Sequence, residues 1–233
     1  MKSLKLASAA AALVLSTSAN AAIISYGGYT HDTDTDIVTG NGLEWLQWDR
    51  TVGESINSIQ SQLNSLDGGG WSVASNVQMA QLFNAFAFNF GYVFDSDENT
   101  RESVYTGYSQ GDPGTEADEL FINMFGDTYL AGGSTYCYGS NCLTAAIAYF
   151  GTDPDSDGTY NLASVYDDYI DNFSAPQSGA ATLFADGYYP SVGYQYYGIA
   201  LVRDVSAVPV PAAVWLFGSG LIGLAGIARR KKA

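Results

Sequence analysis

The segment between residues 22 and 208 contains no lysine, and its only basic side chains are Arg50, Arg101 and Arg203. All 24 acidic residues of the chain lie in the same segment, which gives it a formal net charge of −21. Such a surface repels the phosphates of nucleic acids and of anionic lipids, so we expect neither as a partner. Acidity by itself also serves solubility, and it does not require a specific site.

Residues that carry much of enzyme chemistry are scarce. The chain has one histidine, His31, and no Gly-x-Ser-x-Gly elbow, phosphate-binding loop or His-Glu-x-x-His motif. Most nucleophile–base pairs are therefore excluded, and we predict that the protein is not an enzyme. Because carboxylate pairs hydrolyse glycosides, a secreted glycan hydrolase is kept as the least favoured alternative.

Cysteine is nearly absent, with only Cys137 and Cys142 in the chain. In an exported protein such a pair is most simply a disulfide. The bridge would close only a short loop, so it would stabilise a local hairpin rather than the whole fold. A metal site would need further cysteine or histidine ligands nearby, and His31 is far away in the sequence.

The first 21 residues have the three-part pattern of a secretory signal peptide. A basic start with Lys2 and Lys5 precedes an apolar run over 6–15, and Ala19-Asn20-Ala21 supplies a small-x-small cleavage site. The apolar run is shorter than the ~20 residues of a membrane span. We therefore predict export and removal of 1–21 by signal peptidase, which leaves an acidic ectodomain over 22–205.

The ectodomain reads as an α+β fold. Aromatic residues make up 14% of the chain and hydrophobic residues 47%, which favours a packed core over disorder. Helices are predicted over 51–66, 75–86 and 115–125, the first two with capping boxes at Thr51/Glu54 and Ser75/Gln78. Strands are predicted over 23–26, 143–150 and 198–203, with a turn at Gly40-Asn41-Gly42.

Three short motifs in this order resemble a bacterial family, the Lcl-type C-terminal domain. They read GLEWL at 42–46, GGWSVA at 69–74 and IALVRD at 199–204. The sequence SVAS at 72–75 departs from the family, which has RLPT there. The resemblance spans about 23–205 and implies a C-type-lectin-like fold with the first and last strands paired. The sugar-binding motifs of calcium-dependent lectins are absent, so lectin activity does not follow.

The stretch DPDSDG at 153–158 matches the first half of a calcium-binding loop. Its candidate ligands are Asp153, Asp155 and Asp157. The twelfth position of an EF-hand loop holds a bidentate glutamate, whereas this chain has Ser164 there, so the acidic pair at 167–168 is the candidate substitute. The alternative is an acidic turn, because Asp, Pro, Ser and Gly all favour turns.

Two other stretches admit both a functional and a structural interpretation. Tyrosines crowd into 188–197, where they serve either glycan contact or packing, and we favour packing. Asp32, Asp34 and Asp36 alternate in a segment that we expect to be extended, so their side chains would share one face. They form either a cation patch or an edge strand on which like charges discourage aggregation, and we favour the edge strand.

The C-terminal stretch 206–233 differs from everything before it. Pro209-Val210-Pro211 is followed by an apolar run over 212–228, at the lower limit for a membrane-spanning helix. Four basic residues follow at once and would stay in the cytoplasm: Arg229, Arg230, Lys231 and Lys232. We therefore predict a C-terminal anchor in the inner membrane.

This arrangement of Pro-x-Pro, a glycine-rich apolar span and a basic tail resembles the PEP-CTERM sorting signal. Val210 stands where that family commonly has glutamate. The resemblance implies recognition by an exosortase, with cleavage near Pro209–Pro211. It also implies a Gram-negative bacterium that makes exopolysaccharide, and a final place at the cell surface or in the extracellular matrix.

Together these features predict an exported, non-catalytic protein that binds exopolysaccharide or another surface component, with calcium as the one candidate cofactor. The alternative is a structural matrix protein whose hydrated acidic surface is itself the function.

Overall fold

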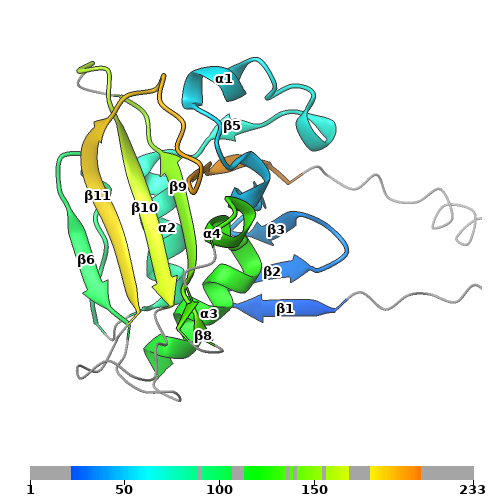
Figure 1. The fold of residues 1–233 in the computed structure, drawn as a ribbon, viewed down its shortest axis with the longest axis vertical. Coiled ribbons are helices and arrows are strands. Elements are labelled where there is room, and N and C mark those ends of the chain that lie inside the picture. The colour runs from blue at the N-terminus through cyan, green and yellow to red at the C-terminus, as the bar shows by residue number, and fades with distance from the viewer. Residues whose placement is uncertain are drawn as a thin grey trace, which may run out of the picture.

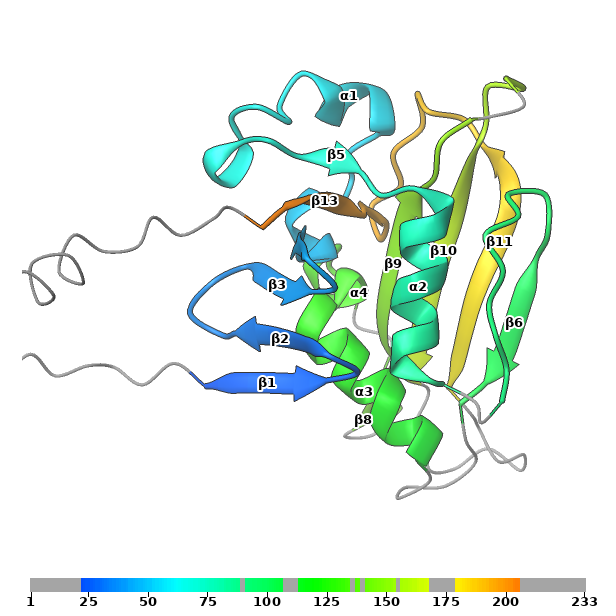
Figure 2. The same ribbon diagram turned by 180° about the vertical axis from the view of Figure 1, so that it is seen from behind.

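The computed structural model describes residues 22–88, 91–106, 113–134, 137–138, 141–153, 156–167 and 179–205. Two larger sheets stand side by side, and helices α2 and α3 pack in the core that joins them (Figures 1 and 2). The predicted α+β class is confirmed, with strands predominating. The principal elements are β1 (Ile23–Tyr26), β2 (Tyr29–Asp32), β3 (Ile37–Gly40), β4 (Leu43–Leu46), α1 (Ile56–Gln60), β5 (Ser72–Val73), α2 (Asn76–Phe86), β6 (Glu102–Tyr105), α3 (Pro113–Phe125), α4 (Thr128–Ala131), β7 (Cys137–Tyr138), β8 (Asn141–Cys142), β9 (Thr144–Phe150), β10 (Tyr160–Asp167), β11 (Ala180–Tyr188), β12 (Gly198–Ile199) and β13 (Leu201–Asp204).

The first sheet has the strand order β1-β2-β3-β4-β13-β5. Its first four strands are joined by hairpins, and β13 returns from the end of the ectodomain to pair antiparallel with both β4 and β5. Val202 lies opposite Trp45 on one side and Ser72 on the other. The strands of the three motifs at 42–46, 69–74 and 199–204 are therefore neighbours in one sheet.

The second sheet has the order β12-β9-β10-β11-β6. Strand β9 reads TAAIAYF and is buried along nearly its whole length, because one face points to the shared core and the other to a second cluster. An apolar run without polar alternation is typical of a strand covered on both faces. The predicted strand over 143–150 is confirmed.

The shared core is rich in aromatic rings. Phe121 of α3 lies 4.8 Å from Phe86 of α2 and 5.2 Å from Trp48, measured between ring centroids. Trp45 and Trp48 are fully buried. Each large apolar side chain that is removed from water contributes about 1.5–3 kcal/mol to the stability of the fold. The packing of this cluster therefore holds the helices between the sheets.

The predicted helix over 51–66 is wrong in its extent. Only Ile56–Gln60 is α-helical, and Ser55 with Ser58 forms its capping box in place of Thr51 and Glu54. The Thr51 hydroxyl accepts a hydrogen bond from the Ile199 amide at 2.7 Å, and Gly53 has a φ of +84°. The chain cannot continue a helix through that conformation. The apolar side chains of Ile56, Ile59, Leu63 and Leu66 nevertheless pack in one hydrophobic cluster.

The other helices follow the sequence closely. The helix predicted over 75–86 is α2, and the predicted Ser75/Gln78 capping box is present. The helix predicted over 115–125 is α3. The strand predicted over 198–203 divides: β12 pairs in parallel with β9, whereas β13 belongs to the first sheet. Strands β10 and β11 were not predicted.

Two other expectations are corrected by the strand pairing. Asp34 and Asp36 do not lie on an edge strand, because Asp32 ends β2 and the other two belong to the turn before β3. The lectin-like resemblance implied that the first and last strands pair. In the described ranges β1 pairs with β2, and β13 pairs with β4 and β5. The C-type-lectin-like fold is not confirmed.

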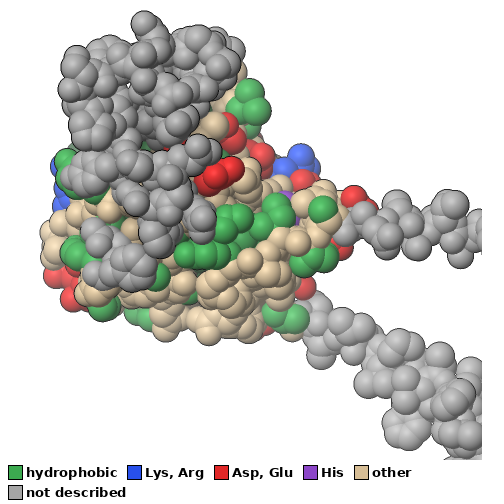
Figure 3. All heavy atoms as spheres, turned by 90° about the horizontal axis from the view of Figure 1, so that it is seen from below, with side chains coloured by type: hydrophobic (Ala, Val, Ile, Leu, Met, Phe, Trp, Pro, Cys, Tyr) green, Lys and Arg blue, Asp and Glu red, His purple; other side chains and the backbone are tan. Residues whose placement is uncertain are grey.

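The charged side chains of the described part are predominantly acidic. On the face seen in Figure 3, acidic side chains are scattered and basic ones show only at the margins. The three arginines all have contacts: Arg50 pairs with Asp36 at 3.0 Å, Arg203 pairs with Glu44 at 2.6 Å, and Arg101 lies over a phenylalanine ring.

The predicted signal peptide at 1–21 and the predicted anchor at 212–228 lie outside the described residues. Of the helices within the described ranges, none has the length and apolar character needed to cross a membrane.

Candidate functional site

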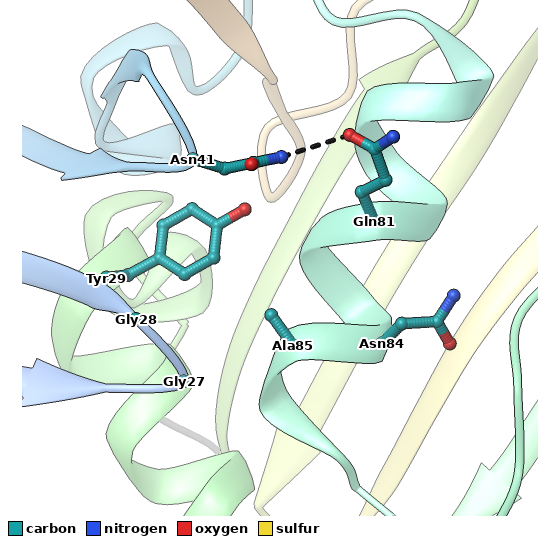
Figure 4. A pocket seen from close by; sticks show the side chains of 7 residues that line it. All are labelled: Gly27, Gly28, Tyr29, Asn41, Gln81, Asn84 and Ala85. Atoms are coloured by element: carbon teal, nitrogen blue, oxygen red, sulfur yellow. Dashed lines mark hydrogen bonds between the residues drawn. The ribbon is translucent and has the colours of Figure 1, made fainter.

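A pocket of about 590 Å³ opens where two hairpin turns of the first sheet meet helix α2 (Figure 4). Asn41 comes from the β3–β4 turn, and Gln81 and Asn84 come from α2. The remaining wall is formed by Gly27, Gly28, Tyr29 and Ala85. The pocket thus joins segments that are far apart in the sequence.

Both turns are shaped by positive φ angles. Gly27 and Gly28 join β1 to β2 with φ angles of +59° and +83°, and Asn41 and Gly42 join β3 to β4 with +52° and +76°. Two-residue turns of this kind match the twist of a hairpin, and glycine and asparagine accept them most readily. The predicted turn at Gly40-Asn41-Gly42 is confirmed.

The first turn lies directly against the helix. A Cβ atom built on Gly27 would be only 2.5 Å from the carbonyl oxygen of Ala85. No side chain larger than hydrogen fits that gap without a shift of the backbone. Glycine at this position therefore sets the distance between the β1–β2 turn and α2, and with it the width of the pocket.

The polar groups of the pocket are amides and a phenol. The Asn41 amide donates to Gln81 Oε1 at 3.1 Å, which leaves Asn41 Oδ1 and Gln81 Nε2 outside that bond. Tyr29 directs its hydroxyl toward the space between them (Figure 4). Burial raises the pKa of Tyr29 to about 12, so this phenol stays neutral at ordinary pH.

The helix side of the pocket is braced by a second pair of bonds. Asn84 accepts from the Phe94 amide at 2.7 Å and donates to the Phe94 carbonyl at 2.9 Å. The loop that follows α2 is thereby held against the helix. No side chain of Asp, Glu, Lys, Arg or His is among the residues that line this pocket. The site offers neutral donors and acceptors on an otherwise anionic protein.

The structure describes the predicted calcium loop only in part, because Asp155 lies outside the described residues. Asp153 Oδ2 accepts from the Gly158 amide at 3.0 Å, and Asp157 Oδ1 accepts from the Thr159 amide at 2.8 Å. Within the described ranges no three Asp, Glu, His or Cys side chains are grouped to hold a metal ion. Calcium binding stays a prediction.

Of the two suggested substitutes for the missing glutamate, the described one, Asp167, does not reach this loop. Ser164 is fully buried in the middle of β10. Asp167 is at the far end of the same strand, opposite Thr144, whereas the loop precedes the first residue, Tyr160. At about 3.3 Å per residue the two ends of β10 are ~23 Å apart. The second half of the acidic pair, Asp168, lies outside the described residues.

The two cysteines face each other across a small hairpin. Cys137 of β7 is the register partner of Cys142 of β8. Directly opposite residues in an antiparallel pair have Cα atoms about 4.5–5.5 Å apart, within the range that a disulfide spans. The side chains of both cysteines lie outside the described part, so the bridge stays a prediction.

The tyrosine-rich segment serves mainly as packing, in line with the favoured interpretation. The rings of Tyr188 and Tyr197 each lie 5.7 Å from that of the buried Tyr149. Tyr189 and Tyr194 remain 65% and 52% exposed.

One carboxyl group has a strongly altered acidity. Asp118 of α3 is fully buried, accepts a hydrogen bond from the Thr106 hydroxyl, and lies near Asp167. Burial raises the pKa of Asp118 to about 7, and the Thr106 bond opposes that rise. Sequence patterns gave no sign of it, because its environment is assembled by α3 and two strands.

The single histidine, His31, is buried and lies 2.9 Å from the Thr35 carbonyl through Nε2.

Comparison with known proteins informs the C-terminal end rather than the ectodomain. No curated protein and no solved structure is significantly similar to the chain. Residues 207–232, which include Pro209, Val210, Pro211 and the four basic residues at 229–232, match the family model of the PEP-CTERM protein-sorting motif. This match supports an exported protein that is a membrane-anchored precursor until an exosortase processes it.

Proposed function

We propose that the ectodomain is a non-catalytic binding module for a neutral polysaccharide, which the sorting signal delivers to the cell surface or extracellular matrix. Exopolysaccharide of the producing Gram-negative cell is the proposed ligand. The observation that carries the proposal is the pocket between α2 and the two hairpin turns, whose polar lining is made of uncharged amides and a phenol.

The chemistry of the lining suits sugar hydroxyls. Amide groups both donate and accept hydrogen bonds, as hydroxyl groups do, and a neutral ligand loses little by leaving water when each of its groups finds a partner. A polyanion would approach a domain with a formal net charge of −21 against electrostatic repulsion. A neutral polymer meets no such barrier.

The binding test uses the protein with its C-terminal segment in detergent and the purified exopolysaccharide, with and without calcium. We expect binding that is weakened about two- to tenfold by Gln81→Ala, because that change removes about one hydrogen bond to the ligand. The matched control is Gln60→Ala, an exposed amide of α1 that is not among the pocket-lining residues.

Three results would change the proposal. Absence of binding in either condition would favour the structural acidic matrix protein. Binding that needs calcium and is unaffected by Gln81→Ala would move the site to the 153–158 loop. Turnover of the polymer would revive the glycan hydrolase.

Sorting is tested separately by the mass of the mature protein. In cells that contain the exosortase we expect a C-terminus near Pro209–Pro211, and in cells that lack it a chain that ends at Ala233. The same unprocessed mass in both strains would leave a plain membrane anchor. Glutamate in place of Val210 tests whether the departure from the common motif slows processing.

A further inference from the structure

Two smaller hollows continue the amide pocket along helix α2. The middle hollow, of about 390 Å³, shares Gln81 and Asn84 with the amide pocket. The end hollow, of about 320 Å³, shares Val77 and Ser96 with the middle one. Each hollow thus shares two lining residues with the next one along the helix.

Three of the residues that line the hollows lie on a single face of the helix. Val77, Gln81 and Asn84 are spaced by four and three residues, so they lie one above another on the same side of α2. From Asn76 to Ala85 the helix rises about 14 Å at 1.5 Å per residue. A single sugar fills only part of this length, whereas a short stretch of polymer fills all of it.

The lining changes character along the groove. The first hollow presents amides. The middle one adds the carboxylate of Asp95 and the side chains of Val77 and Val93, which are 53% and 72% exposed. The end hollow adds the hydroxyl of Thr152 and the carboxylate of Asp97. Apolar side chains beside polar groups suit sugar rings, which have apolar faces and polar edges. The carboxylates of the end hollow disfavour uronic acids.

The outer wall of the groove is held in place without a ligand. Phe94 is bonded through both backbone groups to Asn84, and the Glu98 carbonyl accepts from the buried Asn161 side chain at 2.8 Å. The loop between these two points lines the middle and end hollows. A wall that is already ordered costs little conformational entropy when a ligand binds.

We propose that the three hollows form one groove that binds an extended segment of neutral polysaccharide, several sugar units long, rather than a chain end or a single sugar. The proposal rests on the proposed function and assigns it a ligand length. An extended peptide is less suited, because recognition of such peptides commonly uses a free strand edge, and the groove is lined by a helix, loops and turns.

The test measures affinity against ligand length. Neutral oligosaccharides are cut from the producing cell's exopolysaccharide and separated by length, and each is titrated into the detergent-solubilised chain. We expect the affinity to rise at least about tenfold from one unit to several units and then to level off, once the groove is filled.

Two variants locate the ends of the groove. Asn41→Ala should weaken every fragment that binds. Thr152→Ala should weaken only the longer fragments, because only they reach the end hollow. The exposed Gln60→Ala variant should match the unchanged protein.

The outcomes separate this inference from the proposed function. Affinity that is independent of length overturns the extended groove and leaves a single-sugar site. Binding of no fragment overturns both. Preference for an uncharged glycine–serine peptide over every sugar also overturns both and assigns the groove to a polypeptide.

Discussion

The guanidinium of Arg203 lies over the ring of Trp71, 4.2 Å from the ring centroid. Its Nε donates to Glu44 at 2.6 Å, and its Nη1 donates to the carbonyls of Asp67 and Gly69 at 2.8 Å and 2.9 Å. One side chain of β13 thus binds β4, the loop after α1 and the residue before β5. The first sheet is joined to its covering loop at this point.

Arg203→Lys should destabilise the fold, although the charge is kept. A lysine has neither the planar group that stacks on an indole nor donors spaced for three oxygens at once. We expect a loss of about 1–3 kcal/mol in the free energy of unfolding, measured with urea. The control is Arg50→Lys, whose pair with Asp36 is exposed and should change stability by less than about 1 kcal/mol. Equal effects at the two positions would contradict this account.

Asp118 should make the stability depend on pH. Its folded-state pKa is raised to about 7, above the value of about 4 in an unfolded chain, so the folded state holds the proton more tightly. Its contribution is fully present below about pH 4 and is lost as the pH rises through about 7. In Asp118→Asn we expect this part of the pH dependence, on the order of 2–4 kcal/mol, to disappear from unfolding curves recorded between pH 4 and 8.

Thr106→Val provides the companion measurement. It removes the hydrogen bond that lowers the pKa of Asp118, so the pH range in which stability falls should move upward. If the free energy of unfolding depends on pH in the same way for the unchanged protein and for Asp118→Asn, the carboxyl group does not titrate as inferred.

Asn161→Ala should weaken both the fold and the groove. The buried Asn161 side chain accepts from Asn76 at 3.0 Å and donates to the carbonyls of Glu98 and Phe184 at 2.8 Å and 2.9 Å. The variant would leave buried groups without partners, at a cost of about 2–4 kcal/mol. Because Glu98 belongs to the wall of the groove, polysaccharide affinity should fall as well. Asn99→Ala, an exposed neighbour, should alter both quantities little.

The cysteine pair predicts a mass and a modest effect on stability. The exported protein should be about 2 Da lighter than its reduced form, and one cross-linked peptide should contain Cys137 and Cys142. Reduction of the disulfide should lower the free energy of unfolding by at most about 2 kcal/mol, because the closed loop is short. A cross-link to a second chain, or free thiols in the exported protein, would contradict the predicted bridge.

The elements that the sequence predicted best are those with local causes. The helix at 75–86 begins at Ser75 because Ser75 and Gln78 satisfy each other's backbone amides, and this pattern is visible in the sequence. The start of the helix predicted over 51–66 is wrong because the Thr51 hydroxyl bonds to Ile199, a partner 148 residues away. A contact between residues so far apart produces no local pattern in the sequence from which it could be predicted.

The pocket could not be predicted from the sequence either, because it also depends on contacts between residues far apart in the chain. The turn at Asn41 was predicted, but its meeting with Gln81 depends on the order of strands in the first sheet and on the approach of Gly27 to α2. The sorting motif, in contrast, is contiguous, and its recognition needs no fold. The sequence therefore gave more information on processing than on binding.

The position of β13 has a mechanical consequence. Only residues 205 and 206 separate the end of this strand from the matched sorting motif, and β13 lies between β4 and β5 inside its sheet. Tension on a chain held at its C-terminal segment would enter the domain through a strand that is hydrogen-bonded on both sides. Extraction of that strand must break the hydrogen bonds to both neighbouring strands together. An edge strand such as β1 can instead be pulled away from its single partner one hydrogen bond at a time. The fold thus places such a load on an interior strand.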